Sequence, residues 1–347
     1  MKALSRWIGL SVLSCFLVGC TATSSTPNPS RTLVTTSTIE ISVAGSLQLG
    51  VWHDMVYDEQ VGQVILINGG PEKGKSPEDP VELWGWDGKD WSMVDTGPEA
   101  PRWRNFASVA YDSNRNVLVL YSGIQPEEIF SETWEWDGTF WKQITDEGPG
   151  PREAAGMAYD VKRERIVLFG GTQLGKMMND TWEWDGMEWK RIPVEGPSAR
   201  FPAGFAYDET NQNILLFGGH KYEDQGFTTH DDTWTWNGVV WKLITSEGPS
   251  ARDGARAIFD PLSNNIRLFG GAEITTGIKN LNDTWIWDGT QWEQVKADGP
   301  PARVHPAMAF DESRRVVVMT GGSNGPDVIL SDTWEWNGIK WACADDC

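Results

Sequence analysis

The sequence predicts an all-β protein, a six-bladed β-propeller whose blades are four-stranded antiparallel sheets. The first observation behind this prediction is a Trp-x-Trp doublet that recurs at intervals of 48 to 52 residues. The doublets begin at Trp84, Trp134, Trp182, Trp234, Trp285 and Trp334. The second observation is a further tryptophan after each doublet, preceded in every case by an Asp-Gly or Asn-Gly pair. Eighteen of the 21 tryptophans obey this period of about 50 residues, which indicates stacked repeat units.

Each unit contains four strand-like segments. The first is a run of small and apolar residues that ends in Tyr-Asp or Phe-Asp, such as Tyr159-Asp160. The second is an apolar run that ends in Gly-Gly, as in residues 166–171, and a variable loop follows it. The third is Asp-Thr-Trp-x-Trp, whose two tryptophans share one face of a strand. The fourth begins at the further tryptophan, because an Asx-Gly pair between apolar runs is a strong hairpin signal. Six such sheets bury their faces by stacking around an axis.

The Gly-Gly pair after an apolar strand, with tryptophan downstream at a period near 50, resembles the kelch repeat. The resemblance extends over residues 37–347 and implies a kelch-type propeller, a fold that hosts many unrelated functions. We interpret the eighteen periodic tryptophans as core between blades. At the closure of the ring, residues 38–44 and 341–347 both match a fourth strand of the last blade. We expect 38–44 to pair there, alone or beside 341–347.

The N-terminus predicts export and lipid anchoring. Lys2 and Arg6 precede an apolar stretch over residues 7–19 that is too short to span a membrane. This stretch ends in Leu-Val-Gly-Cys20, which resembles the lipobox of bacterial lipoproteins and implies cleavage of residues 1–19 and lipidation of Cys20. An ordinary secretory leader is the alternative. Residues 20–36 are rich in Ser, Thr and Pro and are predicted to form a tether. We therefore expect an extracytoplasmic protein on a bacterial membrane, the outer one if the host is Gram-negative, because Thr21 follows the cysteine.

Charge and cysteine usage narrow the function classes. The formal net charge is −20, and an acidic surface repels phosphate backbones, so we expect no nucleic-acid partner. No Cys-x-x-Cys pair or Cys/His cluster has zinc spacing, and we expect neither a metal nor a cofactor. With Cys20 lipidated, Cys343 and Cys347 are the pair that can close a disulfide outside the cytoplasm.

The loops before each first strand and after each second strand open on one face, together with the mouth of the central channel. Counting eight residues back from the Tyr/Phe-Asp aspartate finds an arginine in five units: Arg104, Arg152, Arg200, Arg252 and Arg303. These arginines either bind an anion together or tether loops to nearby backbone or aspartates, and their regular recurrence favours the tether. Residues that break the repeat are the better binding candidates. They are Trp103, Tyr222 and the four histidines His53, His220, His230 and His305, and Trp52 also lacks a counterpart. Arg256 is a further candidate on the binding face.

Two functional hypotheses follow. The first is a non-catalytic binding or scaffolding module that recognises a glycan or a protein partner through this face. The second is an enzyme that resembles the periplasmic sialate mutarotases, six-bladed kelch proteins that act on an acidic sugar. That resemblance implies roles for Arg104, Arg256, His305 and Glu153, although no catalytic residue is identified by a motif. A copper radical oxidase of the galactose oxidase type is excluded, because its Tyr–Cys crosslink needs a cysteine and residues 21–342 contain none.

Overall fold

The computed structural model describes residues 52–70, 76–223, 226–275, 277–325 and 328–347, together with Leu47 and Leu49. The predicted leader, the predicted tether and residues 38–44 lie outside the described residues. The chain divides into two units, Met1–Gly45 and Ser46–Cys347, and the second unit carries the fold. Regular structure in the described ranges is all β, and no helix there has the length and apolar character needed to cross a bilayer.

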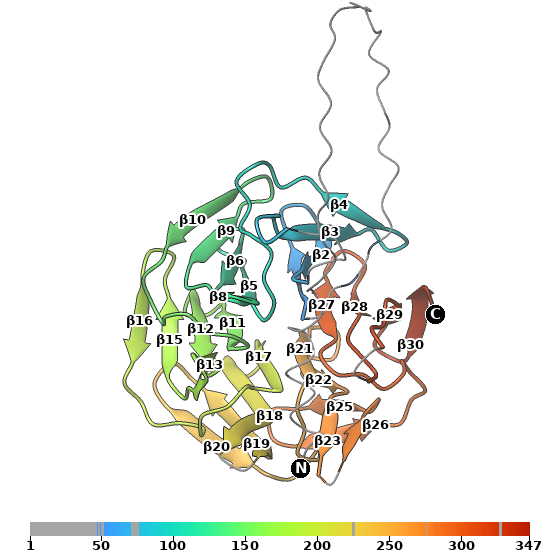
Figure 1. Ribbon diagram of the computed structural model, residues 1–347. Helices are drawn as coiled ribbons and strands as arrows, with labels where there is room; N and C mark the ends of the chain where they lie inside the picture. The colour runs from blue at the N-terminus through green and yellow to red at the C-terminus, as the bar shows by residue number, and fades with distance from the viewer. Residues whose placement is uncertain are drawn as a thin grey trace, which may run out of the picture. The chain divides into compact units, whose positions relative to one another are not determined.

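Six four-stranded antiparallel sheets, blades 1 to 6, follow one another along the chain and surround a common axis (Figure 1). Blade 1 consists of β1 (Asp54–Asp58), β2 (Gln63–Asn68), β3 (Glu82–Trp86) and β4 (Trp91–Val94). Blade 2 consists of β5 (Ser108–Asp112), β6 (Val117–Tyr121), β9 (Thr133–Trp136) and β10 (Trp141–Thr145). Blade 3 consists of β11 (Gly156–Asp160), β12 (Arg165–Phe169), β15 (Thr181–Trp184) and β16 (Trp189–Ile192).

Blade 4 consists of β17 (Gly204–Asp208), β18 (Asn213–Glu223), β19 (Gly226–Trp236) and β20 (Trp241–Thr245). Blade 5 consists of β21 (Arg256–Asp260), β22 (Asn265–Phe269), β25 (Thr284–Trp287) and β26 (Trp292–Val295). Blade 6 consists of β27 (Ala307–Asp311), β28 (Val316–Thr320), β29 (Thr333–Trp336) and β30 (Trp341–Asp345). Short hairpins extend three of the loops between second and third strands. They are β7 (Ile124–Gln125) with β8 (Glu128–Ile129), β13 (Thr172–Gln173) with β14 (Lys176–Met177), and β23 (Ala272–Ile274) with β24 (Ile278–Asn280).

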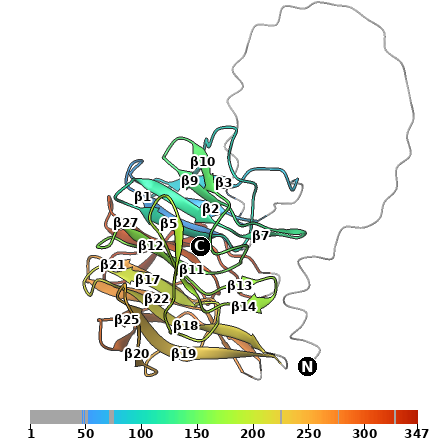
Figure 2. The ribbon, with the colours of Figure 1, turned by 90° about the vertical axis from the view of Figure 1, so that its left-hand side faces the viewer.

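The first strand of each blade lines the axis. These six strands contact one another in order around the ring, and β27 of the last blade meets β1 of the first, which closes it. The side view in Figure 2 shows the blades stacked as successive layers across the unit. The predicted fold is therefore confirmed, blade by blade and strand by strand.

The Asx-Gly turns form for a local reason that the sequence carries. In blade 3, Trp184 pairs with Trp189 across the hairpin of β15 and β16. Between them, Oδ1 of Asp185 accepts hydrogen bonds from the backbone N–H groups of Met187 and Glu188, both at 2.9 Å. Gly186 follows with φ of 94°, a left-handed conformation that glycine adopts without strain.

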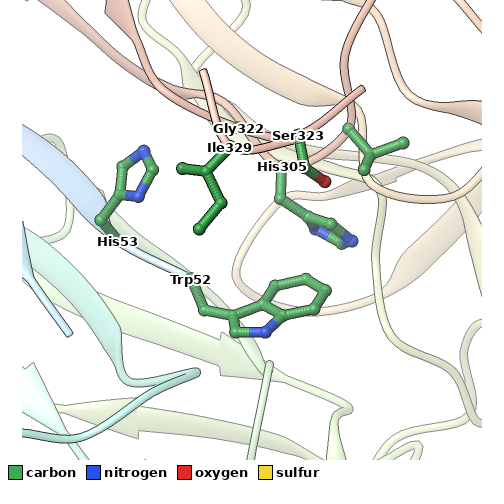
Figure 3. A pocket seen from close by; sticks show the side chains of 7 residues that line it. Trp52, His53, His305, Gly322, Ser323 and Ile329 are labelled. Carbon is green, nitrogen blue, oxygen red and sulfur yellow. The ribbon is translucent and has the colours of Figure 1, made fainter. Parts of the chain in front are cut away.

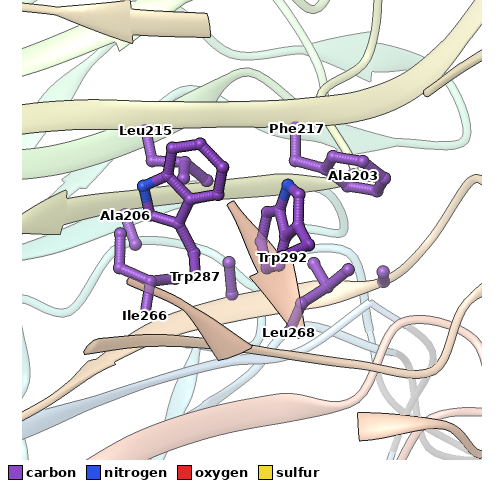
Figure 4. Close-up of a cluster of buried hydrophobic side chains, with 10 residues drawn as sticks. Ala203, Ala206, Leu215, Phe217, Ile266, Leu268, Trp287 and Trp292 are labelled. Carbon is purple, nitrogen blue, oxygen red and sulfur yellow. The ribbon is translucent and has the colours of Figure 1, made fainter. Parts of the chain in front are cut away.

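The hydrophobic core lies between the blades, as predicted for the periodic tryptophans. Figure 4 shows the interface of blades 4 and 5, where Leu215 and Phe217 of β18 face Trp287 and Trp292 of blade 5. Similar clusters fill each of the other interfaces, including that of blades 6 and 1. Each buried aromatic side chain removes a large apolar area from water, so the interfaces supply most of the stabilising burial.

A hydrogen bond between neighbouring blades fixes the outer tryptophan in most interfaces. Nε1 of Trp292 in blade 5 donates to Oγ1 of Thr233 in blade 4 at 2.9 Å, and both side chains are buried. The same bond joins Trp91 to Thr333, Trp189 to Thr133, Trp241 to Thr181 and Trp341 to Thr284. Blade 1 carries Leu83 where the other blades have this threonine, and Nε1 of Trp141 has no hydrogen-bond partner among the described residues.

The sixth blade is completed by the C-terminus. β30 pairs with β29 as the outer strand, so the interpretation in which residues 38–44 fill this edge alone is wrong. The reason is that Trp341 docks as its counterparts do, and this docking carries residues 341–345 into register with β29. The disulfide expected between Cys343 and Cys347 is present at the end of this strand.

Candidate functional site

The channel-mouth face is the side on which the loops before each first strand meet the loops after each second strand. The two sets of loops are joined by short backbone bridges, such as that between Glu153 and Thr172. The Gly-Gly pairs make this approach possible: a Cβ on Gly171 would lie 2.6 Å from the backbone oxygen of Glu153. The repeat thus builds a platform of recurring backbone bridges, and loop length and side chains differ from blade to blade.

The five regular arginines are interior tethers. In blade 5, the Arg252 guanidinium donates to both carboxylate oxygens of Asp283, at 2.7 and 3.0 Å, and to the backbone oxygen of Gly270 at 3.0 Å. Asp283 also accepts from the Trp285 indole at 2.7 Å. Burial alone would raise the pKa of Asp283, but Arg252 and this indole outweigh burial and hold the pKa below its usual range.

The same arrangement recurs within each blade from 2 to 6. The pairs are Arg104 with Glu132, Arg152 with Asp180, Arg200 with Asp232, Arg252 with Asp283 and Arg303 with Asp332. All five arginines are buried, so they are removed from the candidate binding face and the tether interpretation is confirmed. In blade 2 the pair differs, because a glutamate replaces the aspartate and Arg104 lies 3.8 Å from the centre of the Phe130 ring.

Trp103 is also interior, contrary to its predicted place on the binding face. Its side chain is 3% exposed, and Nε1 donates to the backbone oxygen of Ser76 at 2.8 Å. The insertion that carries Trp103 is held by blade 1, because the backbone N–H of Trp103 also donates to the oxygen of Asp79. Trp103 therefore locks the loop of blade 1 onto blade 2.

One residue per blade, six positions before the aspartate that ends the first strand, surrounds the opening of the channel. We call these residues the mouth ring: Trp52, Phe106, Ala154, Pro202, Gly254 and His305. All except Pro202 have φ between 51° and 67°. Neighbouring members touch: the N–H of Ala154 donates to the oxygen of Phe106, and the N–H of His305 donates to that of Gly254. The left-handed turn recurs in five of the six blades, so these five ring members differ only in their side chains.

Those side chains divide the mouth ring into a bulky half and a small half. The Trp52 indole stacks on Phe106 with ring centres 4.0 Å apart, and it meets the His305 imidazole edge-on at 3.9 Å. Trp52 belongs to blade 1, Phe106 to blade 2 and His305 to blade 6. Between the Trp52 indole and blade 6 lies a hollow of about 30 Å³, lined also by His53 and Ile329 (Figure 3). A hollow of that size holds water molecules and no larger ligand.

On the small half, the acidic group Asp253 lies beside two histidines. Its Oδ1 is 2.8 Å from Nδ1 of His220, and its Oδ2 is 3.9 Å from Nε2 of His305. Burial alone would raise the pKa of Asp253, but the two imidazoles and the N–H of Gly254 outweigh it and lower the pKa to about 2. Burial lowers the pKa of His305 to about 4 despite the nearby carboxylate. At neutral pH Asp253 is therefore ionised and His305 is neutral.

Blade 4 adds aromatic surface next to this group. Its second and third strands, β18 and β19, are longer than those of the other blades and stay paired as far as Glu223 and Gly226. His220 lies at the centre of this surface, with ring centres 4.7 Å from Phe201, 5.0 Å from Tyr222 and 5.8 Å from Phe227. Tyr222 is 37% exposed, so it presents an aromatic ring to solvent.

The carboxylate of Glu153 and the ion pair of Arg256 with Asp54 are the other charged groups of this face. Burial, and then the negative charges of Asp253 and Glu153, raise the pKa of Tyr222 to about 12. Arg256 at the start of β21 forms an ion pair with Asp54 at the start of β1, between blades 5 and 1, which are not adjacent. This pair crosses the channel opening below the mouth ring.

Most irregular residues that the sequence singled out do gather on this face. His220, Tyr222 and His305 lie in one continuous group, and Arg256 lies close to His305, whose pKa it helps to lower. His230 is on β19, half-buried near Arg200, and burial lowers its pKa. Sequence reasoning missed Phe106, Phe201, Asp253 and Gly254. Counting six residues back from the strand-ending aspartate, rather than eight, would have found the mouth ring.

The described residues contain no group of three or more His, Cys, Asp or Glu side chains placed to share a metal ion. Among family models, that of the KLHDC2/KLHL20/DRC7 Kelch-repeats domain matches residues 183–342, from the third strand of blade 3 to the last strand of blade 6. A search of curated proteins finds no match to the chain.

Proposed function

Because the chain is a kelch-repeat β-propeller, we propose that it is a binding scaffold that recognises a protein partner through the channel-mouth face. The fold suggests such a scaffold, since its loops vary on a rigid platform. The observation that carries the proposal is the loss of six-fold symmetry at the mouth ring. Identical backbone turns carry Trp52 and Phe106 on one side, and Ala154 and Gly254 on the other.

The shape of the mouth favours a protein over a small molecule. Sites for small molecules usually enclose about 300–1,000 Å³. The hollow beside Trp52 measures about 30 Å³, and the aromatic group around His220 stands on an open hairpin. A partner that lies across the face can contact both, and exposed tyrosine beside charged groups is typical of interface centres.

The burial of Arg104 removes one candidate site residue from the mutarotase hypothesis. Arg104 was one of the two arginines implied to hold a sugar carboxylate, and it is buried and paired with Glu132 at 3.0 Å. Arg256, His305 and Glu153 are on the channel-mouth face, but Arg256 already pairs with Asp54. Mutarotase activity is therefore the second hypothesis, and an experiment is needed to exclude it. Exchange NMR on the anomers of sialic acid tests it, and accelerated mutarotation by the purified protein would replace the binding proposal.

We also propose that Cys20 anchors the scaffold to a bacterial membrane, on the strength of the Leu-Val-Gly-Cys motif alone. Replacing Cys20 by serine should abolish labelling with palmitate and move the protein out of the membrane fraction. Retained labelling in that variant would overturn the anchoring proposal without affecting the binding one.

Site-specific photocrosslinking in the native host tests the binding proposal. A photoreactive amino acid at Tyr222 should give discrete crosslinked products, whose identities mass spectrometry can establish. The matched control is Ile339, which is 80% exposed in the last hairpin turn of blade 6, on the opposite face. Crosslinks to protein from position 339 but not from 222 would place the interface elsewhere. Products from 222 that glycosidases digest would reassign the ligand to a glycan.

A further inference from the structure

The outer edge of blade 1 differs from the outer edges of blades 2 to 5. The fourth strand is outermost in each sheet, as β4 is in blade 1 (Figure 1), and its second residue is exposed in every blade. In blades 2 to 5 that residue is charged: Lys142, Lys190, Lys242 and Glu293. Blade 1 has Ser92 and blade 6 has Ala342, but the strand of blade 6 ends in the loop that the disulfide of Cys343 with Cys347 closes. Exposed edges are commonly protected by charged side chains, and β4 lacks this protection.

The backbone of β4 has unused hydrogen-bonding groups on this edge. Its residues from Trp91 to Val94 pair on one side only, with Trp86 to Leu83 of β3. In an antiparallel ladder, alternate residues direct their N–H and C=O groups away from the partner strand. Within the described ranges, no other strand or loop hydrogen-bonds to β4 on its outer side. Such a row of N–H and C=O groups is complementary to the backbone of another extended chain.

An open hollow of about 280 Å³ lies at the end of this edge. It is lined by residues 79–82 and 93–96, which flank the last pair of β3 with β4, that of Leu83 with Val94. Its apolar lining includes Val81 and Met93, and Met93 is 59% exposed. The hollow can therefore take one side chain of a strand that pairs with β4, and the exposed thioether of Met93 offers apolar contact to it.

The polar lining of the hollow is negative. Its polar side chains are Asp79, Glu82, Asp95 and Thr96. Asp79 accepts a hydrogen bond from the backbone N–H of Ser76 at 2.8 Å, and Asp95 accepts one from that of Gly97 at 3.0 Å. In the part of the chain that the structure describes, neither carboxylate forms an ion pair. A basic side chain in the hollow is therefore favoured over a neutral or acidic one.

We propose that an extended segment of a protein partner adds to the edge of β4 as a fifth strand of blade 1 and places a lysine or arginine in the hollow. The alkyl stem of that residue packs against Met93, and its charged group meets Asp79 and Asp95. The chain's net charge of −20 favours a basic segment over a second copy of this chain, whose edge is equally acidic. The proposal rests on the proposed scaffold function, to which it adds a second contact surface, and does not depend on the mouth ring.

Peptide titrations test this surface without a known partner. The probe is Ac-Thr-Val-Lys-Val-Thr-NH2, whose β-branched residues favour an extended chain. Two further peptides carry N-methyl groups, one on the valines and the other on the remaining residues, so each blocks one edge of the probe. The readout is the 13C methyl signal of Met93, assigned with Met93→Leu. We expect the probe to bind with a dissociation constant on the order of 1 mM. The methylated peptide whose methyl groups face β4 should lose binding, and the other should retain it.

Two variants separate the edge from the hollow. Ser92→Lys gives β4 the residue that blades 2, 3 and 4 carry at this position, and it should weaken probe binding about fivefold or more. The matched control Gln294→Lys adds the same charge to an exposed position of β26, the outer strand of blade 5, and should leave binding unchanged. Asp95→Asn keeps the oxygen that accepts from Gly97 and removes one charge from the hollow. It should weaken binding about threefold, and norleucine in place of lysine in the probe should weaken binding at least as much.

Three results would overturn the proposal: equal binding by the probe and both methylated peptides, equal binding by the norleucine peptide, or equal effects of Ser92→Lys and Gln294→Lys. A dimer in sedimentation that Ser92→Lys abolishes would instead assign the edge to a second copy of the chain. Photocrosslinking in the native host keeps this proposal separate from the proposed function. Crosslinks to protein from position 222 but not from 92 would leave the scaffold and remove the edge site. Crosslinks from 92 alone would support the edge site and contradict the channel-mouth interface.

Discussion

Replacing Arg252 by methionine tests the interior role of the regular arginines. Methionine keeps the aliphatic stem and removes the guanidinium, which donates to both oxygens of Asp283 and to the backbone oxygens of Gly270 and Ser250. Asp283 is left with the Trp285 indole and no cation. Breaking one partner of a buried ion pair costs about 3–5 kcal/mol, most of it from the carboxylate left uncompensated. We expect a loss of that size in the free energy of unfolding at pH 7.

The control is Arg102→Met. Arg102 forms an ion pair with Glu128 at 2.8 Å, but the two side chains are 31% and 47% exposed. Solvent screens such a pair, so this change should cost about 1 kcal/mol or less. The two substitutions are chemically identical and lie in equivalent loops, and burial is the variable that differs.

Acid adds a second test of the same pair. The pKa of Asp283 is lowered by folding, so the pair contributes stability above the unfolded value of about 3.8 and loses it as pH falls toward the lower folded pKa. The difference between the unaltered protein and Arg252→Met should therefore be largest at neutral pH and shrink below about pH 4. Guanidinium chloride unfolding measures both effects. A cost under 1 kcal/mol at pH 7, or one equal to that of Arg102→Met, would refute the tether assignment.

Three other outcomes are expected. Trp103→Ala and Trp184→Ala should each lower the free energy of unfolding by about 3–5 kcal/mol in calorimetry, because both indoles are buried. An unchanged stability in Trp103→Ala would contradict the burial of Trp103. Thr233→Val should cost about 1–3 kcal/mol by leaving the Trp292 indole N–H without an acceptor, and no change would show the bond to be dispensable. His305 should titrate near pH 4 by 13C NMR. Because its pKa is lowered by folding, stability from this group is complete above pH 6.5 and declines as pH falls through 4, a decline that His305→Phe should remove.

The sequence was sufficient for the fold because the fold is periodic. Trp184, Trp236 and Trp287 recur in one register, and a single unit could be interpreted from its neighbours. The Asp-Gly turn at Asp185 needs only local hydrogen bonds, so it was visible in the residues themselves. The disulfide of Cys343 with Cys347 followed from elimination of the other cysteines.

The site was less accessible because it depends on packing between blades far apart in the chain. Trp52 and His305 touch across 253 positions, and no local pattern brings them together. Trp103 misled for the same reason: its departure from the repeat suggested exposure, whereas a loop of blade 1 covers it through Ser76. Recurrence in every repeat identified structural residues such as Arg252. Departure from the repeat did not by itself distinguish a surface residue from a buried one such as Trp103.

Through the bond between Trp91 and Thr333, the junction of the first and last blades has the same contact as four of the other five interfaces. In the part of the chain that the structure describes, each blade is formed by one uninterrupted stretch of residues. The order of the blades in the gene is therefore not dictated by the architecture. The chain could be cut in the loop before blade 3 and rejoined through a linker between its natural ends, and the ring would keep its interfaces.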